Sequence, residues 1–140
     1  MIFNTLRKLI IAVCVLLFAQ YWLGMVANLF ITIPFDSPLN FFNYFDGVEV
    51  LAHIMNGILI LGLALVIIVF SYKTGDSLLH WLSTLSLAFV TLAVVMGFVF
   101  MLRGQEDSFS MAMAMSFIFI YTTYFSELIL LWRIRIPDKI

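Results

Sequence analysis

The chain has 140 residues, of which 64% are hydrophobic and 11% are charged. Soluble globular domains contain roughly 45–50% apolar and about 25% charged residues, so this composition excludes a soluble domain and predicts a lipid bilayer as the environment. The net charge of −1 argues against a nucleic-acid partner, and the single cysteine, Cys14, excludes an intrachain disulfide.

Four apolar stretches are long enough to cross a membrane, which takes roughly 20 helical residues. They cover residues 9–33, 48–71, 78–102 and 109–132. Four segments are too few to close a membrane β-barrel, so each is predicted to be a helix. The short links at 72–77 and 103–108 make sequential helices antiparallel neighbours. We therefore expect an all-α, antiparallel four-helix transmembrane bundle, with residues 1–140 forming one domain.

The first span carries Gln20, Gly24 and Asn28 at i, i+4 and i+8, which places all three on one face of the helix. A longer link, residues 34–47, follows this span and is predicted to lie in the outer membrane interface, where aromatic rings are favoured. A surface that docks a partner is the alternative for this link. Its aromatic residues are Phe35, Phe41, Phe42, Tyr44 and Phe45.

The second span begins with His53, Asn56 and Gly57 on one stripe, at the same depth as Asn28. Amide side chains can bond across a close helix contact, so the stripes of the first two spans are expected to face each other. We expect a polar pocket around His53 in the outer half of the membrane. The alternative is that His53 donates to a neighbouring carbonyl or amide and only holds helices together. The candidate cofactor-binding residues are His53, Asn28, Asn56 and Met96, and the pocket is expected to be walled by Met96, Met101, Met111, Met113 and Met115.

The second histidine, His80, begins the third span on the opposite side of the membrane from His53. Both cannot ligate one haem, so a bis-histidine site within one chain is disfavoured, and a multi-histidine metal centre is excluded. In the fourth span, Glu127 is the only carboxylate in the interior of an apolar stretch, since Glu49 stands at the very start of the second, and with Gln20 it is a candidate polar intramembrane residue. It should face protein, with Ser83, Thr84, His80, Arg7 or Lys8 as its partner. Proton relay or quinone contact is the functional interpretation, and a neutral or paired structural carboxyl is the alternative.

The charges outside the spans predict the orientation. One side of the membrane carries six basic residues and the other carries only Arg103 with several acidic residues. The positive-inside rule then places both termini in the cytoplasm of a cell-membrane protein. The six are Arg7, Lys8, Lys73, Arg133, Arg135 and Lys139.

Two resemblances accompany this interpretation. The run from Gln20 to Pro34, the segment Ala52-His53-Ile-Met-Asn-Gly57 and the stretch 110–114 resemble a group of uncharacterised small four-span membrane proteins, mostly archaeal, which implies the fold and no activity. His53 and Gly57 also resemble the H-x-x-x-G pattern in one half of a haem A synthase, whose four-helix half ligates haem b with histidines on its second and fourth helices. The fourth span here has no histidine, so that resemblance lacks its second ligand.

The sequence contains no G-x-S-x-G, H-E-x-x-H or phosphate-binding loop, so it favours a protein that is not an enzyme. The first hypothesis is a non-catalytic accessory or scaffold subunit of a larger, for instance respiratory, membrane assembly. The alternative is a protein that holds haem b or quinone near His53, through a His–Met site or a homodimer. A small transporter is a third hypothesis, which the lack of paired Gly/Pro interruptions in the spans weakens.

Overall fold

A computed structural model describes residues 2–30, 48–103 and 105–133 of the chain. They form four helices, which are α1 (Ile2–Phe30), α2 (Val48–Thr74), α3 (Ser77–Leu102) and α4 (Asp107–Arg133). All four are long and apolar enough to cross a membrane. The predicted all-α fold is confirmed, and the chain is a multi-pass membrane protein. The predictions for residues 34–47, and for Arg135 and Lys139, lie outside the described residues.

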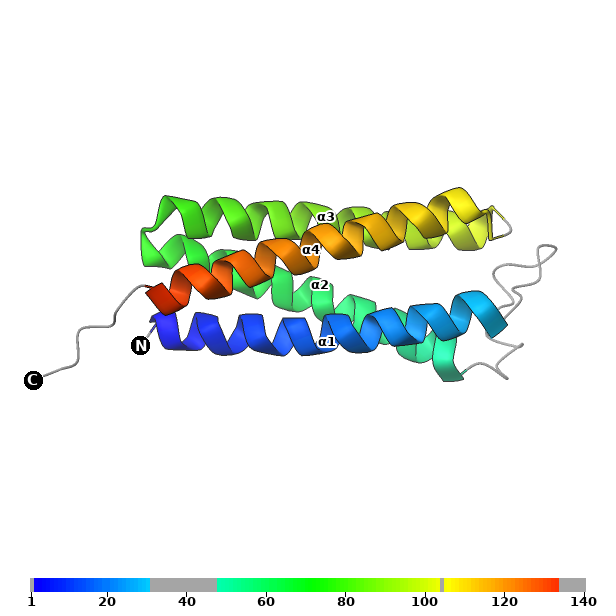
Figure 1. Cartoon of the computed structure of the whole chain (residues 1–140), viewed down its shortest axis with the longest axis horizontal. Helices are drawn as coiled ribbons and strands as arrows, with labels where there is room; N and C mark the ends of the chain where they lie inside the picture. Colours follow the sequence, from blue (N-terminus) through cyan, green and yellow to red (C-terminus); the bar gives the residue numbers. More distant parts are fainter. Residues whose placement is uncertain (1, 31–47, 104, 134–140) are drawn as a thin grey trace, which may run out of the picture.

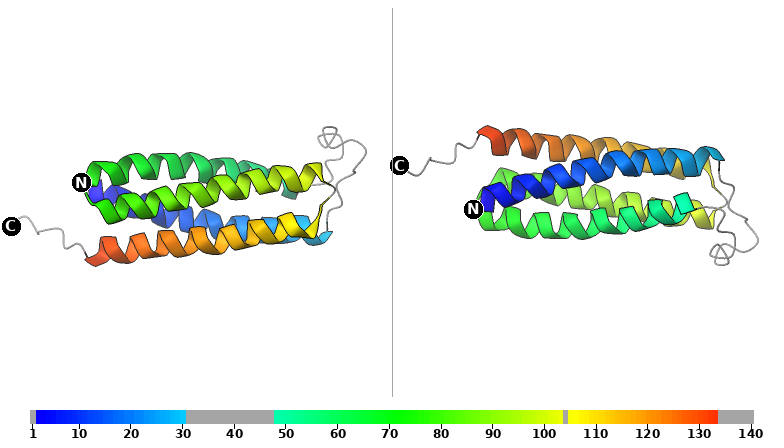
Figure 2. Two further views of the ribbon diagram at one scale, coloured as in Figure 1. Left: turned by 90° about the horizontal axis from the view of Figure 1, so that it is seen from above. Right: turned by 90° about the horizontal axis from the view of Figure 1, so that it is seen from below.

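The helices form an antiparallel bundle in which each helix packs against two neighbours (Figure 1). α1 packs against α2 and α4, and α3 packs against the same two helices, so the four close into a ring. The start of α1, the end of α4 and the turn between α2 and α3 all lie at one end, as both side views show (Figure 2). We call the half of the bundle near these ends the terminal half, and the other the pocket half.

The turn between α2 and α3 is fixed by local hydrogen bonds. Gly75 adopts a positive φ of 72°, a conformation that glycine tolerates without steric cost. Asp76 is the N-cap of α3, and its Oδ1 accepts hydrogen bonds from the backbone N–H groups of Leu78 and Leu79 at 2.9 and 3.0 Å. The first backbone N–H groups of any helix have no acceptor within that helix, and the Asp76 side chain supplies one for two of them. α3 can therefore begin directly after the turn.

An arginine joins the two terminal helices at the same end. Arg7 on α1 donates from a guanidinium nitrogen to the backbone carbonyl of Leu131, 2.8 Å away, near the end of α4. Its guanidinium carbon also lies 4.5 Å from the ring centroid of Trp132, a cation–π contact. The helix dipole also favours a positive charge at a helix C-terminus. Arg7 therefore stabilises the packing of the end of α4 against α1.

Packing is much tighter in the terminal half. All the large side chains with less than 2% exposure lie there, contributed by all four helices. They are Leu6, Ile10, Val13, Ile67, Ser71, Leu79, Ser83, Ser86, Tyr124, Glu127 and Leu131. At mid-bundle a layer of four aliphatic side chains follows, one from each helix, and it is 2–3% exposed. This layer consists of Leu17, Ile60, Val90 and Ile120. Beyond it, in the pocket half, the described residues leave space.

Candidate ligand cavity

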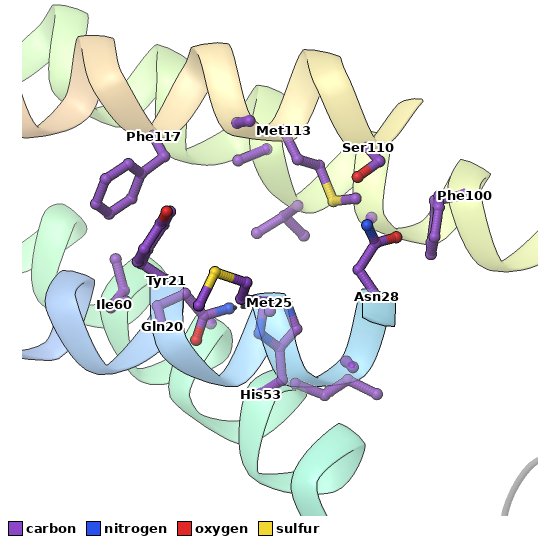
Figure 3. A pocket seen from close by; sticks show the side chains of 18 of the residues that line it. Gln20, Tyr21, Met25, Asn28, His53, Ile60, Phe100, Ser110, Met113 and Phe117 are labelled. Carbon is purple, nitrogen blue, oxygen red and sulfur yellow. Dashed lines mark hydrogen bonds between the residues drawn. The ribbon is translucent and has the colours of Figure 1, made fainter. Parts of the chain in front are cut away.

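A cavity of about 380 Å³ occupies the centre of the pocket half (Figure 3). Side chains from all four helices line it, and its floor is the mid-bundle aliphatic layer. Ligand sites in proteins usually have volumes of roughly 300–1,000 Å³ and mostly apolar walls with a few polar groups. Because a cavity of about 150 Å³ already holds a benzene molecule, this one has room for a substituted ring.

Small residues at inward positions create this space. Gly24 and Ala27 on α1, Gly57 on α2, and Ala93 and Gly97 on α3 all line the cavity. Two of the glycines are in close contact with polar side chains. A Cβ added to Gly24 would lie 2.9 Å from Cε1 of His53, and one added to Gly57 would lie 3.3 Å from Nε2 of Gln20. Gly24 thus leaves room for the imidazole ring, and none of the described side chains fills the remaining volume.

A chain of hydrogen bonds crosses from α2 to α1 and back. Asn56 Nδ2 donates to the backbone carbonyl of Leu16 at 2.9 Å and to Oε1 of Gln20 at 2.8 Å. The Nε2 atoms of Gln20 and His53 lie 3.2 Å apart. The two polar stripes therefore face each other, as predicted. Asn56 on α2 bonds to two groups of α1, the Leu16 carbonyl and the Gln20 side chain.

This chain of hydrogen bonds assigns the tautomer of His53. The Leu16 carbonyl can only accept, so the Asn56 amide must present its nitrogen there, and that nitrogen also requires an acceptor oxygen on Gln20. The Gln20 nitrogen is then left as a donor to His53, whose Nε2 must accept. In a neutral imidazole the proton consequently sits on Nδ1. Nδ1 is buried and has no hydrogen-bond partner among the described residues. His53, which lines the cavity, thus carries a buried N–H donor beside Gly24 that the described residues leave unsatisfied.

Other polar groups line the cavity nearer the end of the bundle. The amide of Asn28 on α1 and the hydroxyl of Ser110 on α4 point toward each other across it, and His53 and Gln20 lie at the other side (Figure 3). The side between α1 and α4 carries two aromatic rings, Tyr21 and Phe117, with centroids 5.4 Å apart. A bound ring would therefore meet an apolar surface along most of its perimeter and polar groups at two places.

The sequence predictions cover this site in part. His53, Gln20 and Asn28 line the cavity, whereas Asn56 and Met96 are not among its lining residues. Of the other predicted methionines, Met101 and Met113 line it, while Met111 and Met115 are 68% and 45% exposed on the bundle surface. The sequence reasoning missed Met25, Tyr21 and Ser110, which also line it. For Tyr21 and Met25, the i, i+4 spacing was a signal that both side chains lie on one helix face. The sequence offered no such signal for Ser110.

Glu127 lies in the terminal half, below the floor of the cavity. It is fully buried, and its Oε2 accepts a hydrogen bond from the hydroxyl of Ser83 at 3.0 Å, one of the partners predicted for it. Ser86, a partner that was not predicted, lies 3.5 Å from Oε1. His80, at the start of α3, packs its ring against Tyr72. The two histidines lie in opposite halves of the bundle, as expected.

The geometry of His53 fits a hydrogen-bonded organic ligand better than a metal. Its Nε2 lone pair accepts from Gln20 and its Nδ1 carries the proton, so neither nitrogen has a lone pair free for haem iron or another metal without a break in the chain of hydrogen bonds. Within the described residues, three or more His, Cys, Asp or Glu side chains nowhere gather in a metal-binding group.

Comparisons with protein family models, with curated proteins and with solved structures give no match to this chain.

Proposed function

We propose that this membrane protein binds a lipid-soluble organic molecule whose polar ring carries a hydrogen-bond acceptor, with quinones as the best-fitting class. The observation that carries the proposal is the mostly apolar cavity between the four helices, whose lining includes His53 with its unpaired Nδ1–H. A quinone carbonyl is an acceptor without a proton of its own, and its ring is flat and apolar. Because Nδ1 is buried beside Gly24, the imidazole must shift toward the cavity to donate to such a carbonyl. That bond would satisfy a donor whose burial without a partner costs about 1–3 kcal/mol.

Haem b, the other cofactor predicted near His53, is less well supported. Iron ligation requires His53 to give up either its bond to Gln20 or its Nδ1 proton. An absorption spectrum of the purified protein, oxidised and then reduced with dithionite, decides between the two classes. We expect no Soret band, and a Soret band that sharpens on reduction in wild type but is lost in His53→Ala would replace the quinone proposal with haem.

Direct titration tests the quinone proposal. The full chain in lipid nanodiscs is titrated with a benzoquinone that carries two isoprene units, and quenching of tryptophan fluorescence reports binding. His53→Phe keeps an aromatic ring and removes the donor, and we expect it to weaken binding about tenfold, which corresponds to roughly 1.4 kcal/mol. Wild-type protein that does not bind, or His53→Phe protein that binds equally well, contradicts the proposal.

Filling the cavity provides a second test with a matched control. Ala93 lines the cavity, whereas Val95 on the same helix is 47% exposed on the bundle surface. We expect Ala93→Leu to abolish quinone binding and Val95→Leu to leave it unchanged. Because the new side chain in Ala93→Leu occupies empty space, the unliganded protein should not become less stable. Loss of binding together with loss of stability would instead indicate a disrupted fold.

The accessory-subunit role remains a second proposal, supported by Gly62. Gly24, Gly57 and Gly97 each lie near a side chain of another helix, but a Cβ added to Gly62, in the middle of α2, meets nothing within 4 Å. Glycines inside membrane helices often mark close approach of another helix, so a helix of another subunit or a second copy could pack there. We expect Gly62→Leu to abolish any co-purification in mild detergent, with Ile58→Leu, at a position 57% exposed, as the control. Co-purification that survives Gly62→Leu contradicts this role.

The proposed orientation places both termini in the cytoplasm and the cavity in the outer half of the cell membrane. It is supported by Lys8, Lys73 and Arg133 at the terminal end and by Glu49, Glu106 and Asp107 at the other end. An epitope fused to Ile140 should resist labelling in intact cells and become accessible after permeabilisation. Labelling of intact cells would reverse the orientation.

A further inference from the structure

A second polar site lies in the terminal half, independent of the cavity. Glu127 on α4 is fully buried between Ser83 and Ser86 of α3, and Thr123, one turn before Glu127, is 7% exposed. The structure gives Glu127 no basic partner among the described residues, since Arg7 donates to the Leu131 carbonyl instead. A lone ionised carboxylate in such a place is strongly disfavoured, which makes the donors and acceptors around it informative.

The hydroxyl groups can be assigned one proton each. Thr123 donates to backbone carbonyls of its own helix, to Ile120 at 2.9 Å or to Phe119 at 3.0 Å. Ser86 donates to Thr123 Oγ1 at 2.7 Å, so its only proton is already used. While Thr123 donates to its backbone carbonyl, the 3.5 Å contact between Ser86 and Glu127 Oε1 is a hydrogen bond only if a protonated Glu127 donates it. Ser83 donates to the other oxygen, Oε2.

We propose that Glu127, Ser83, Ser86 and Thr123 form a proton-binding site inside the membrane, in which Glu127 at neutral pH is a carboxylic acid that donates to Ser86. In this form a continuous series of donors runs from Glu127 through Ser86 and Thr123 to a backbone carbonyl, and each of the Ser83, Ser86 and Thr123 hydroxyl protons has an acceptor. The ionised form would keep the bond from Ser83. Its Oε1 would gain a donor only if Ser86 turned its proton to it and Thr123 gave up its backbone carbonyl to donate to Ser86. The bound species is the proton, and not a metal ion, since the hydroxyl groups already bond directly to one another and to the carboxyl.

Among the described residues, no charged group forms a hydrogen bond or ion pair with Glu127. Cys14 on α1 and Tyr124 on α4 are its titratable neighbours, and both are neutral at pH 7. α2, which lies diagonally across the bundle, contributes the buried Ser71, whose hydroxyl donates to a carbonyl of its own helix. Arg7 and His80 lie nearer the terminal end and are engaged with Leu131 and Tyr72.

Infrared spectroscopy tests the proposal on the full chain in lipid. At pH 7 wild type should show a carbonyl band of a protonated carboxylic acid that is absent from Glu127→Gln, because carboxyl groups in water ionise near pH ~4 and do not contribute. The band should be unaffected when choline chloride is replaced by sodium chloride. Absence of the band at pH 7, or its loss in sodium, overturns the proposal, and the second result would assign the site to a monovalent cation.

Stability measurements provide an independent readout that does not depend on the cavity ligand. The amide introduced by Glu127→Gln can donate to Ser86 and accept from Ser83 as the neutral acid does, so this variant should keep the unfolding temperature of wild type. Ser86→Ala removes the acceptor of the proton and should lower that temperature by a few degrees. Ser126→Ala is the control, since the half-buried Ser126 makes only a solvent-exposed hydrogen bond, to the Thr122 carbonyl of its own helix. A Glu127→Gln protein that unfolds at a much lower temperature than wild type, while Ser86→Ala does not, overturns the proposal.

Discussion

The two halves of the bundle use the same helices for opposite purposes. In the terminal half large side chains from all four helices meet in a fully buried core, and the polar groups around Glu127 are joined to one another. In the pocket half, glycine and alanine face inward and line a cavity. The difference indicates that the terminal half holds the helices together, so that the pocket half can keep an open cavity that close packing would otherwise fill.

Truncating the packed core should have the largest effect on stability. Ile10 is fully buried in the terminal half, and Ile11 beside it is 42% exposed. We expect Ile10→Ala to lower the free energy of unfolding by about 2 kcal/mol, because deleting a side chain that is enclosed on all sides leaves a void. Ile11→Ala should cost much less. Denaturation in mixed micelles measures both, and equal losses would show that the terminal half is not the stabilising part.

The next largest loss of stability is expected for Gly24→Ala, which adds a methyl group in the pocket half. Gly24→Ala brings Cβ within 2.9 Å of the His53 ring, so the imidazole must move and its bond to Gln20 weakens. We expect a loss of about 1 kcal/mol, the usual net value of one hydrogen bond. Gly62→Ala is the control, and it should be neutral or stabilising because alanine is the better helix former. A Gly24→Ala protein as stable as Gly62→Ala would show that the imidazole position is not constrained.

Removing the amide of Asn56 should have the smallest effect of the three. Asn56→Ala deletes the bond that Asn56 donates to Gln20 Oε1, together with the bond to the Leu16 carbonyl that orients the Asn56 amide. Interhelical hydrogen bonds in membranes are worth about 0.6 kcal/mol on average, so the loss of stability should be less than that of Gly24→Ala. Ligand binding should suffer more than stability, because Gln20 then no longer fixes the His53 tautomer. Nitrogen NMR of the imidazole would show a mixture of tautomers, and a single unchanged tautomer would contradict the assignment.

Much of the fold could be predicted from the sequence, since long apolar stretches and short links leave few alternatives. Placing Gln20 opposite His53 was also predictable, because i, i+4 spacing defines one helix face. The cavity was not predictable in detail. Whether Gly97 faces Met113 of its own chain or another subunit depends on helix rotation, which the nearly uniform hydrophobicity of the third span does not determine. The Ser86 contact of Glu127 depends on helix rotation and on side-chain rotamers, and neither follows from spacing along the chain.

The mid-bundle layer of Leu17, Ile60, Val90 and Ile120 has a consequence for charge movement across the membrane. All four side chains are aliphatic and nearly fully buried, and they separate the cavity from the hydroxyl groups around Glu127. A proton cannot be passed through side chains that neither donate nor accept hydrogen bonds. The layer therefore leaves no hydrogen-bonded path for a proton between the cavity and Glu127. A molecule bound in the cavity would exchange any proton at the end of the bundle where Asn28 and Ser110 lie.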